Sequence, residues 1–206
     1  MKEIKLLGKT VYPEKSKLLF KYSPDGSWLD HWQVMAGEWE CKDGWLIGRE
    51  RGNKGGILFS KETYEQNVML SFTAKTELPA TRDLNAVYCA HWDEKTDYLA
   101  DSYVCGLNGW YDGKSGIERN LTSNLYSTTS LYEYIPGTEV RITCGAIDGH
   151  NFLVVDGKLI CELQDPDPIK GGHVGFSPYC TSLMIKDIEI REIYFENKEQ
   201  EYKPEF

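Results

Sequence analysis

The sequence predicts an all-β fold, a two-sheet antiparallel jelly-roll sandwich formed by a single domain over residues 1–206. Three observations predict it. Short runs that alternate apolar and polar residues recur along the chain, five Asp-Gly pairs punctuate them, and no stretch repeats apolar residues at helical spacing over three turns. Sandwiches often reach this length as one domain, so one core is expected.

The hairpins are predicted by turn residues between alternating runs. An Asp-Gly pair supplies the two left-handed residues that a tight hairpin turn needs. Three hairpins are expected on this basis: Glu38–Lys42 with Trp45–Arg49, Arg141–Ile147 with Phe152–Val155, and the latter run with Lys158–Leu163. Several antiparallel hairpins in one chain indicate a meander rather than a parallel sheet.

Two longer runs show the period of two most clearly. In the first, Val68, Leu70, Phe72 and Ala74 are expected to point one way and the polar residues between them the other way. In the second, Ile188 and Ile190 alternate with Asp187, Glu189 and Arg191. Such strands bury one face, so two packed sheets are needed. Only residues 61–66 suggest a short helix, and the polar end from about residue 197 reads as a tail.

Composition and charge limit the partners. The formal charge of −9 and the absence of any run of five Lys or Arg argue against nucleic acid and against an anionic membrane surface. Neither a secretory signal nor an apolar run of 18 residues is found, so we expect a cytoplasmic protein whose six scattered cysteines stay reduced. Aromatic residues make up 13% of the chain, which favours a small saccharide or glycoside as partner, because aromatic faces stack on sugar rings. Homo-oligomer formation stays open.

Two blocks of sequence resemble a known family. The segment from Trp32 to Gly48, which carries Trp39 and Asp43-Gly44, continues to Gly55-Gly56 and Tyr64, and the closing strands run from Pro136 to Asp156-Gly157 and from Gly171 to Ile193. These blocks resemble the 3-keto-disaccharide hydrolase-like domains of the concanavalin A-like lectin and glucanase superfamily. The resemblance implies a concanavalin A-like sandwich and an enzyme that acts on a glycoside, most concretely a 3-keto-glycoside lyase or hydrolase.

The middle of the chain departs from that family. Where the family has an Asn-Ser-Gly strand and a Glu-x-Gln strand, this chain has Asn85 to Trp92 and Gly109 to Asn120, so that Asn85 and Glu118 are the positions that match. A fold hosts many functions, and two other readings therefore stay open. One is a non-catalytic, lectin-like carbohydrate-binding domain, and the other is an accessory subunit of a sugar-processing enzyme.

One group of candidate site residues comes from two neighbouring strands. On a strand from Asn85 to Trp92, Asn85 and His91 would share a face. If the next strand pairs with it, Asp101 and Tyr103 would line the same polar surface. Asn85 and Asp101 are thus candidate substrate-binding residues, whereas His91 and Tyr103 are candidates for catalysis.

The second group lies in a predicted long loop, Asn108 to Asn124. It combines an aromatic platform with charge and amide groups, as sugar binding requires, and its candidates are Trp110, Lys114, Glu118, Arg119 and Asn120. Arg49 and Arg51 are expected to reach the same surface. A solvated loop and a solvated strand edge are the simpler explanations of the same residues.

The resemblance also implies roles. In a sugar oxidised at C3, a base removes the C2 proton and an acid protonates the departing oxygen; His91 suits the base, and Glu118 or Tyr103 suits the acid. Lys114 or Arg119 would then stabilise the enolate oxygen. No cofactor is required by this chemistry. A divalent cation could bind at the turn Asp165-Pro-Asp167-Pro, as in some lectin-like sandwiches, although its prolines also explain the turn.

Overall fold

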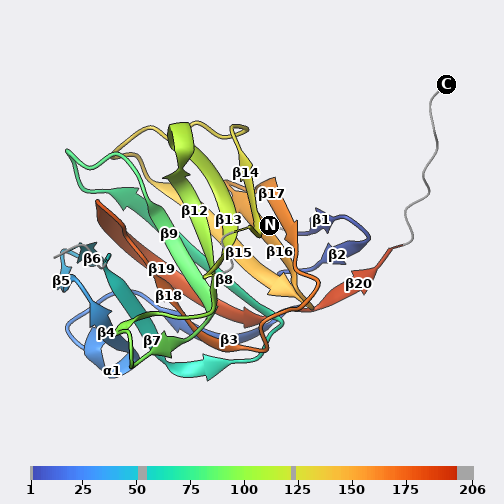
Figure 1. Ribbon diagram of the computed structural model, residues 1–206, viewed down its shortest axis with the longest axis horizontal. Helices are drawn as coiled ribbons and strands as arrows, with labels where there is room; N and C mark the ends of the chain where they lie inside the picture. Colours follow the sequence, from blue (N-terminus) through green and yellow to red (C-terminus); the bar gives the residue numbers. More distant parts are fainter. Residues whose placement is uncertain (1, 51–54, 122–123, 199–206) are drawn as a thin grey trace.

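The computed structural model describes residues 2–50, 55–121 and 124–198. Two antiparallel sheets lie face to face in these ranges and form a sandwich (Figure 1). The all-β, two-sheet jelly-roll class predicted from the sequence is therefore confirmed.

The first sheet contains eight strands among the described residues. Seven of them follow one path, and the eighth, β3, pairs with β19 beside that path. The strands in spatial order are β17 (Lys158–Gln164), β16 (His150–Val155), β15 (Val140–Ile147), β8 (Val68–Thr76), β19 (Ser182–Glu192), β6 (Trp45–Arg49) and β5 (Glu38–Lys42), with β3 (Lys17–Tyr22) against β19.

The second sheet has seven strands in the described ranges and carries the candidate site. Its order mixes distant parts of the chain, because β9 lies between β12 and β18. The strands in spatial order are β14 (Tyr126–Thr129), β13 (Lys114–Asn120), β12 (Ser102–Trp110), β9 (Leu84–Ala90), β18 (Gly172–Phe176), β7 (Ile57–Tyr64) and β4 (Trp32–Ala36). The face of this sheet that is turned away from the eight-stranded sheet is called the outer face below.

The core lies between the two sheets and follows the predicted alternation. Leu70, Phe72 and Ala74 of β8 are fully buried in one cluster with the inward residues of the other sheet. Ile188 and Ile190 of β19 are buried in the same cluster. Full burial of a side chain as large as Phe72 stabilises a fold by roughly 1.5–3 kcal/mol, so this alternation fixes which face of each strand points inward.

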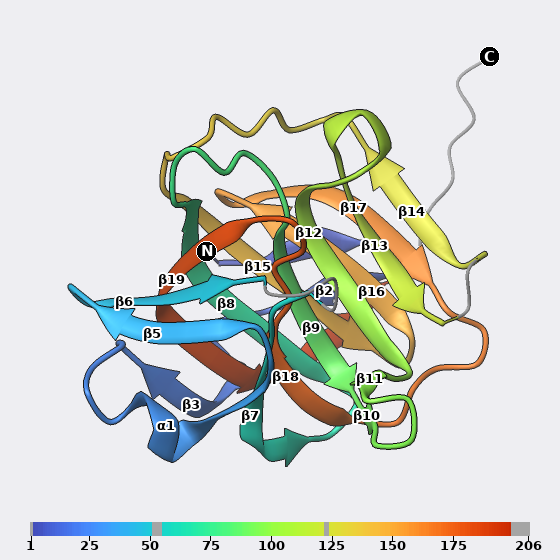
Figure 2. The same ribbon diagram turned by 60° about the vertical axis from the view of Figure 1, so that its left-hand side comes forward.

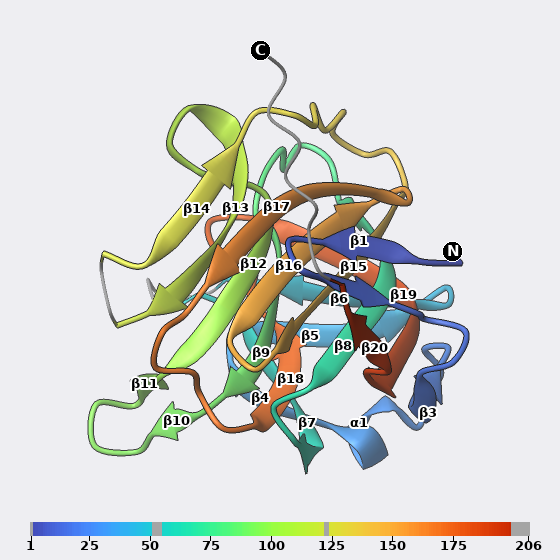
Figure 3. The ribbon, with the colours of Figure 1, turned by 90° about the vertical axis from the view of Figure 1, so that its right-hand side faces the viewer.

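A third, small sheet covers part of the far side of the sandwich. It consists of β1 (Ile4–Leu6), β2 (Lys9–Val11) and β20 (Phe195–Asn197), which lie against the eight-stranded sheet (Figure 3). Ile4 and Val11 pack on Met69 there, which explains why Met69 is buried although it lies on the polar side of β8. Asn197 pairs with Lys9, and the predicted tail beyond residue 198 lies outside the described residues.

The predicted turns have the expected backbone. Both residues of Asp43-Gly44, Asp148-Gly149 and Asp156-Gly157 have φ between 48° and 82°, the left-handed region that these hairpin turns require. The helix predicted at residues 61–66 is wrong, because the chain continues as β7 to Tyr64 and pairs there with β18. The α-helix found in the described ranges is the short α1 (Trp28–His31).

A short hairpin lies against the outer face. It is formed by β10 (Trp92–Asp93) and β11 (Tyr98–Leu99), stands at the end of β9 (Figure 2), and is called the capping hairpin below. Leu99 and Trp92 pack on an apolar cluster of the outer face whose other members are Met35, Ala36, Ile57, Phe59, Val87, Ala90 and Val104. Part of the outer face is thus filled and unavailable to a ligand.

The cysteines and the membrane-spanning potential of the helices complete the description of the fold. Each of the six cysteines lies in a described range and is a free thiol. Among the described helices, none has the length and apolarity needed to cross a bilayer.

Candidate functional site

Three hollows meet on the outer face where β12, β13 and β14 run side by side. Their volumes are about 590, 710 and 150 Å³, and Trp110 and Glu118 line all three. They extend in different directions: the first over β13 toward Tyr126, the second toward Arg82, and the smallest toward Leu99. Trp110 and Glu118 are therefore the centre of the candidate site.

Trp110 is held at this junction by its neighbours. Its indole Nε1 donates a hydrogen bond of 2.8 Å to Glu118 Oε2. The ring lies close over Gly116, because a Cβ built there would stand 3.3 Å from Trp110 Cδ2. After Trp110 the chain makes a 3₁₀ turn, η1 (Tyr111–Gly113), in which Asp112 and Gly113 have positive φ. Tyr111 is 88% exposed beside the hollows, so aromatic surface is available to a ligand.

Asp83 is a second carboxyl group in the same hollows as Glu118. It precedes β9, is 4% exposed, and lines two of the three hollows. Burial raises the pKa of Asp83 to about 6, and the charge of Glu118 contributes in the same direction, against the opposite effect of Arg82. The Arg82 guanidinium lies 3.3 Å from Asp83 Oδ2. A carboxyl group near half protonation at mildly acidic pH thus faces a ligand-sized hollow.

Asn85 connects this carboxyl group to the strand. Its Nδ2 donates a 3.1 Å hydrogen bond to Asp83 Oδ1, whereas its buried Oδ1 has no hydrogen-bond partner among the described residues. A Cβ at Gly109 would stand 3.0 Å from the Asn85 amide and from Asp83 Oδ1, and a Cβ at Gly106 would collide with Asn85 Oδ1. The two glycines leave room for these polar groups at the sheet surface. Because unsatisfied buried acceptors are rare, Asn85 Oδ1 is suited to accept a hydrogen bond from a ligand hydroxyl.

The predicted surface of Asn85, His91, Asp101 and Tyr103 is not formed. Pairing places Asn85 opposite Gly106 and Tyr103 opposite Tyr88, so Tyr103 points inward and is fully buried in the core. Its hydroxyl donates to Asp165 Oδ2 at 2.7 Å, and the burial raises its pKa further above the ordinary value. A shift of one residue in register moves a side chain to the other face of a sheet. The sequence does not state the register between β9 and β12, so the face on which Tyr103 lies could not be predicted.

His91 does not lie on the same surface as Asn85, for a different reason. Cys89 has φ of 48°, and the pairing between β18 and β9 shifts at this point, so the alternation along β9 is broken before His91. His91 is exposed, its Nε2 lies 3.0 Å from the Gly171 carbonyl oxygen, and it lines none of the three hollows. His91, Glu118 and Tyr103 are therefore not brought together.

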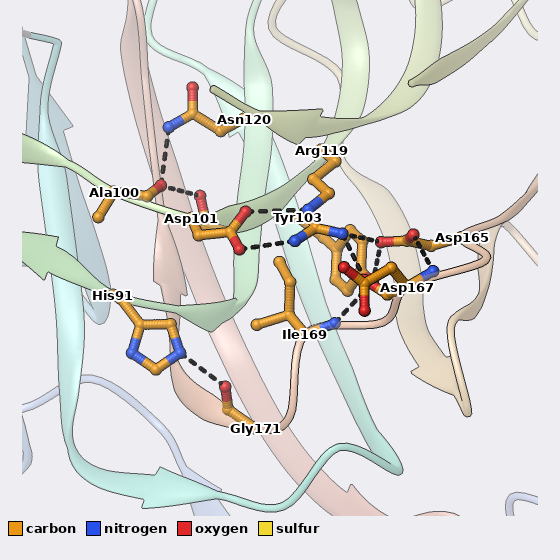
Figure 4. Close-up of polar contacts among 11 residues, drawn as sticks. His91, Ala100, Asp101, Tyr103, Arg119, Asn120, Asp165, Asp167, Ile169 and Gly171 are labelled. Atoms are coloured by element: carbon orange, nitrogen blue, oxygen red, sulfur yellow. Dashed lines mark hydrogen bonds and ion pairs between the residues drawn. The ribbon is translucent and has the colours of Figure 1, made fainter. Parts of the chain in front are cut away.

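Arg119 lines the hollow over β13, but its guanidinium is paired with two carboxylates, those of Asp101 and Asp165. The Arg119 guanidinium makes two bonds to the Asp101 carboxylate, of 3.0 and 2.8 Å, and one of 2.8 Å to the buried Asp165 Oδ2 (Figure 4). Hydrogen bonds and charge from Asp101 hold the pKa of Arg119 above its ordinary value. The Asp167 backbone N–H also donates to Asp165, so a cation at the predicted turn would have to displace a guanidinium. No three His, Cys, Asp or Glu side chains within residues 2–50, 55–121 and 124–198 are placed to hold a metal ion.

The other predicted residues divide between the site and its surroundings. Lys114 begins β13 opposite Trp110 and lines the hollow of about 590 Å³ that extends over that strand. Asn120 reaches the hollows, but its Nδ2 donates to the carbonyl oxygens of Leu99 and Ala100 at 3.0 and 2.8 Å. The predicted loop of residues 108–124 is wrong over β13, because Ser115, Gly116 and Ile117 are buried and paired.

Arg49 lies on the other sheet. It is paired on both sides, with Glu77 through two bonds of 2.9 and 3.0 Å and with Glu40 at 2.6 Å, and it lines none of the three hollows. The expectation that Arg49 reaches the candidate surface is therefore wrong. Arg51 lies outside the described residues.

Three residues of the site were missed by the sequence analysis. They are Asp83 and two tyrosines, Tyr98 and Tyr179, which form a wall of the smallest hollow. Burial, with the charge of Glu118 among the smaller causes, raises the pKa of Tyr98 above its ordinary value. A signal for Asp83 existed, since Asp83 and Asn85 place polar groups at every second position at the start of an otherwise apolar strand. Nothing in the sequence indicated Tyr98 and Tyr179, because they lie in segments that are far apart in the sequence and meet only in the fold.

Comparisons with known proteins address the fold. The sequence matches no protein-family model and no curated protein. Among solved structures, the chain is similar to a Bacillus subtilis protein of unknown function with a galectin-like fold (TM-score 0.63, 12% identity, 87% of this chain and 98% of that one). It is also similar to domain 4 of AbnA, a GH43 extracellular arabinanase from Geobacillus stearothermophilus, in complex with arabinotriose (TM-score 0.58, 12% identity, 86% and 93%). A third similar structure is the Crh5 transglycosylase (TM-score 0.59, 13% identity, 86% of both chains). At these identities the likeness establishes the sandwich fold alone.

Proposed function

We propose that this protein binds a saccharide in the hollows around Trp110 and cleaves a glycosidic bond there, with Asp83 as the acid and Glu118 as the base or nucleophile. The observation that carries the proposal is the pair of carboxyl groups in one hollow beside an aromatic platform. Glycosidases use two carboxyl groups that flank the scissile bond, one of them protonated. Asp83, with its pKa near 6, fits the protonated one.

Trp110 supplies the binding surface. Aromatic rings stack on the C–H faces of sugar rings, and here the indole is fixed by Gly116 and Glu118, so little freedom is lost on binding. Tyr111 and Tyr126 lie beside the same hollow, with 88% and 58% of their surface exposed. Asn85 Oδ1 is an acceptor for a sugar hydroxyl.

The chemistry can follow either of two routes with the same residues. In hydrolysis, Asp83 donates its proton to the departing oxygen, and Glu118 activates water or attacks the anomeric carbon. In elimination from a 3-keto-glycoside, which the family resemblance implies, Glu118 removes the C2 proton, Asp83 protonates the departing oxygen, and the products are an enone and the free alcohol. Lys114, at the edge of the hollow, is then the cation available to the C3 oxygen, because Arg119 is committed to Asp101 and Asp165.

The similar structures support a carbohydrate role without choosing the reaction. One is a domain of an arabinanase in complex with arabinotriose, and another is a transglycosylase. Asp83 is already in contact with Arg82 and Asn85, and this contact favours a second candidate function, a lectin-like site that binds a saccharide and leaves it intact.

The test compares cleavage and binding in the same variants. The protein is incubated at pH 5–7 with a panel of oligosaccharides and a 3-keto-glucoside, and released sugar, alcohol and enone absorbance are measured. Asp83→Asn is expected to lose at least 100-fold in product release while it retains saccharide binding, because the amide keeps the bond to Asn85 but carries no transferable proton. The matched control is Asp43→Asn, a change in the β5–β6 turn of the other sheet, which lines none of the hollows and should cleave normally.

The outcomes separate the candidates. Saccharide binding without any product from the unmodified protein would contradict the enzyme and support the lectin-like site. Failure of every saccharide in the panel to bind would contradict both.

A further inference from the structure

The capping hairpin closes one end of the candidate site. Trp92 and Leu99 of the hairpin pack on Phe59, Val87 and Val104 of the outer face. Leu99 is 5% and Val104 8% exposed, so hardly any space remains beneath the hairpin. The outer face beyond Leu99 is therefore filled by apolar side chains of β4, β7 and β9.

The base of the hairpin is held on both sides. On one side, the Ala100 N–H donates to the His91 carbonyl oxygen at 2.9 Å, and the His91 ring contacts the Gly171 carbonyl oxygen at 3.0 Å. On the other, Asn120 donates to the Leu99 and Ala100 carbonyl oxygens.

The next residue of the chain strengthens this attachment. Asp101 is held by Arg119, whose guanidinium also pairs with the buried Asp165 (Figure 4). Arg119 and Asn120 directly follow Glu118 on β13, so the strand that carries the proposed catalytic carboxylate also fixes the hairpin. The hairpin is thus built as a wall attached to the sheet rather than as a free loop.

The smallest of the three hollows is bounded by this wall. Tyr98 and Leu99 line this hollow together with Asp83, Trp110 and Glu118. The two larger hollows continue from Trp110 and Glu118 in other directions, toward Arg82 and over β13 to Tyr126. A ligand that reaches Asp83 and Glu118 therefore meets a closed end on the side of the hairpin.

We propose that this blind end makes the site specific for the terminus of a saccharide chain or for a short glycoside, with the terminal sugar between Trp110 and the Tyr98–Leu99 wall. A saccharide chain with a sugar in the smallest hollow could not continue past the hairpin, because Leu99 and Trp92 fill the space there. The rest of such a chain would extend only into the larger hollows. The inference rests on the proposed function, since it names the kind of saccharide that the same site takes.

The experiment compares preparations of one polysaccharide that differ in the number of chain ends but not in their sugars or linkages. Starch, xylan, arabinan and galactan are each prepared intact and after partial acid hydrolysis that raises the number of chain ends about tenfold at equal mass. The binding capacity for the full-length protein, in moles per gram, is measured by equilibrium depletion. For any polysaccharide that binds, the capacity is expected to rise severalfold in proportion to the ends.

Two variants identify the wall. Tyr98→Ala opens the blind end by removing a ring that lines it, and is expected to reduce the difference between the two preparations at least threefold. Tyr194→Ala removes a similarly exposed tyrosine that lines none of the hollows at the site and should leave the difference unchanged.

Each result bears on the proposal. Equal capacity of intact and hydrolysed material would overturn the specificity for chain ends while leaving saccharide binding in place. An unchanged ratio in Tyr98→Ala would overturn the assignment of the hairpin as the wall. Binding of none of the eight preparations would overturn the proposed function together with the inference that rests on it.

Discussion

Replacement of Asp83 by Asn is expected to make the protein more stable, and more so as the pH rises. Folded Asp83 keeps its proton up to about pH 6, whereas the unfolded chain loses it near the ordinary pKa of 3.8. Between these values the folded state binds more protons, so the contribution of Asp83 to stability is present below pH 3.8 and is lost as the pH rises through 6. A buried carboxyl group that must ionise is thus a cost above pH 6.

The magnitude follows from the two pKa values. The difference between 3.8 and about 6 corresponds to about 3 kcal/mol of unfolding free energy at pH 8. Asn retains the shape of Asp83 and its bond to Asn85, and the contact with Arg82 is of small value because the Arg82 side chain is 56% exposed. Relative to the unmodified protein, Asp83→Asn should therefore gain up to about 3 kcal/mol between pH 4 and pH 8.

The assay is urea unfolding followed by tryptophan fluorescence at intervals of half a pH unit. Asp93→Asn serves as the control, because hydrogen bonds from Lys95 and Thr96 lower the pKa of Asp93. The stability that this carboxylate contributes is present above its ordinary pKa of 3.8 and is lost only as the pH falls, so Asp93→Asn should destabilise the protein by a nearly constant amount from pH 5 to pH 8. A difference between Asp83→Asn and the unmodified protein that stays constant from pH 4 to pH 8 would refute the raised pKa. Combined with lost cleavage, the expected gain would mean that the protein retains a destabilising group for its activity.

Four further changes test the site and the fold. Glu118→Gln should lower product release at least 100-fold with binding retained, since its amide oxygen still accepts from Trp110; unchanged turnover would exclude Glu118 from the reaction. Trp110→Ala should weaken saccharide binding about tenfold in calorimetry through lost stacking, and equal affinity would contradict the platform. Arg119→Leu should cost about 3–5 kcal/mol in urea unfolding because it leaves the carboxylate of Asp165, 1% exposed, without its ion pair; a loss below 1 kcal/mol would contradict this role. Phe72→Ala should cost about 3–5 kcal/mol by the same assay, and a smaller loss would show that the core collapses around it.

The fold was predictable because it depends on short-range patterns. The alternation around Phe72 selects a buried face, and pairs such as Asp43-Gly44 set the hairpin turns. Both signals lie within a few residues of each other. The helix predicted at residues 61–66 failed because pairing of β7 with β18, about a hundred residues away in sequence, overrode the local preference.

The site was predictable only in part, because it depends on register and on long-range neighbours. Trp110 and Glu118 were found from residue type, and the structure places them in contact. Tyr103 was assigned to the wrong face by one residue of register, and the backbone at Cys89 moved His91 away. Asp83 was not among the predicted site residues, although it alternates with Asn85, because burial raises its pKa and the sequence pattern does not indicate that burial.

The central claim is that a saccharide occupies the hollows at Trp110, between Asp83 and Glu118. The most direct measurement is the indole N–H resonance of Trp110, assigned through Trp110→Phe, in two-dimensional nitrogen–proton spectra during titration with the saccharide that binds best. Since this N–H donates to Glu118 inside the site, its resonance should shift in proportion to occupancy, whereas that of the buried Trp32 stays in place. Saturating saccharide that leaves the Trp110 resonance unmoved while shifting signals from the eight-stranded sheet would contradict the account.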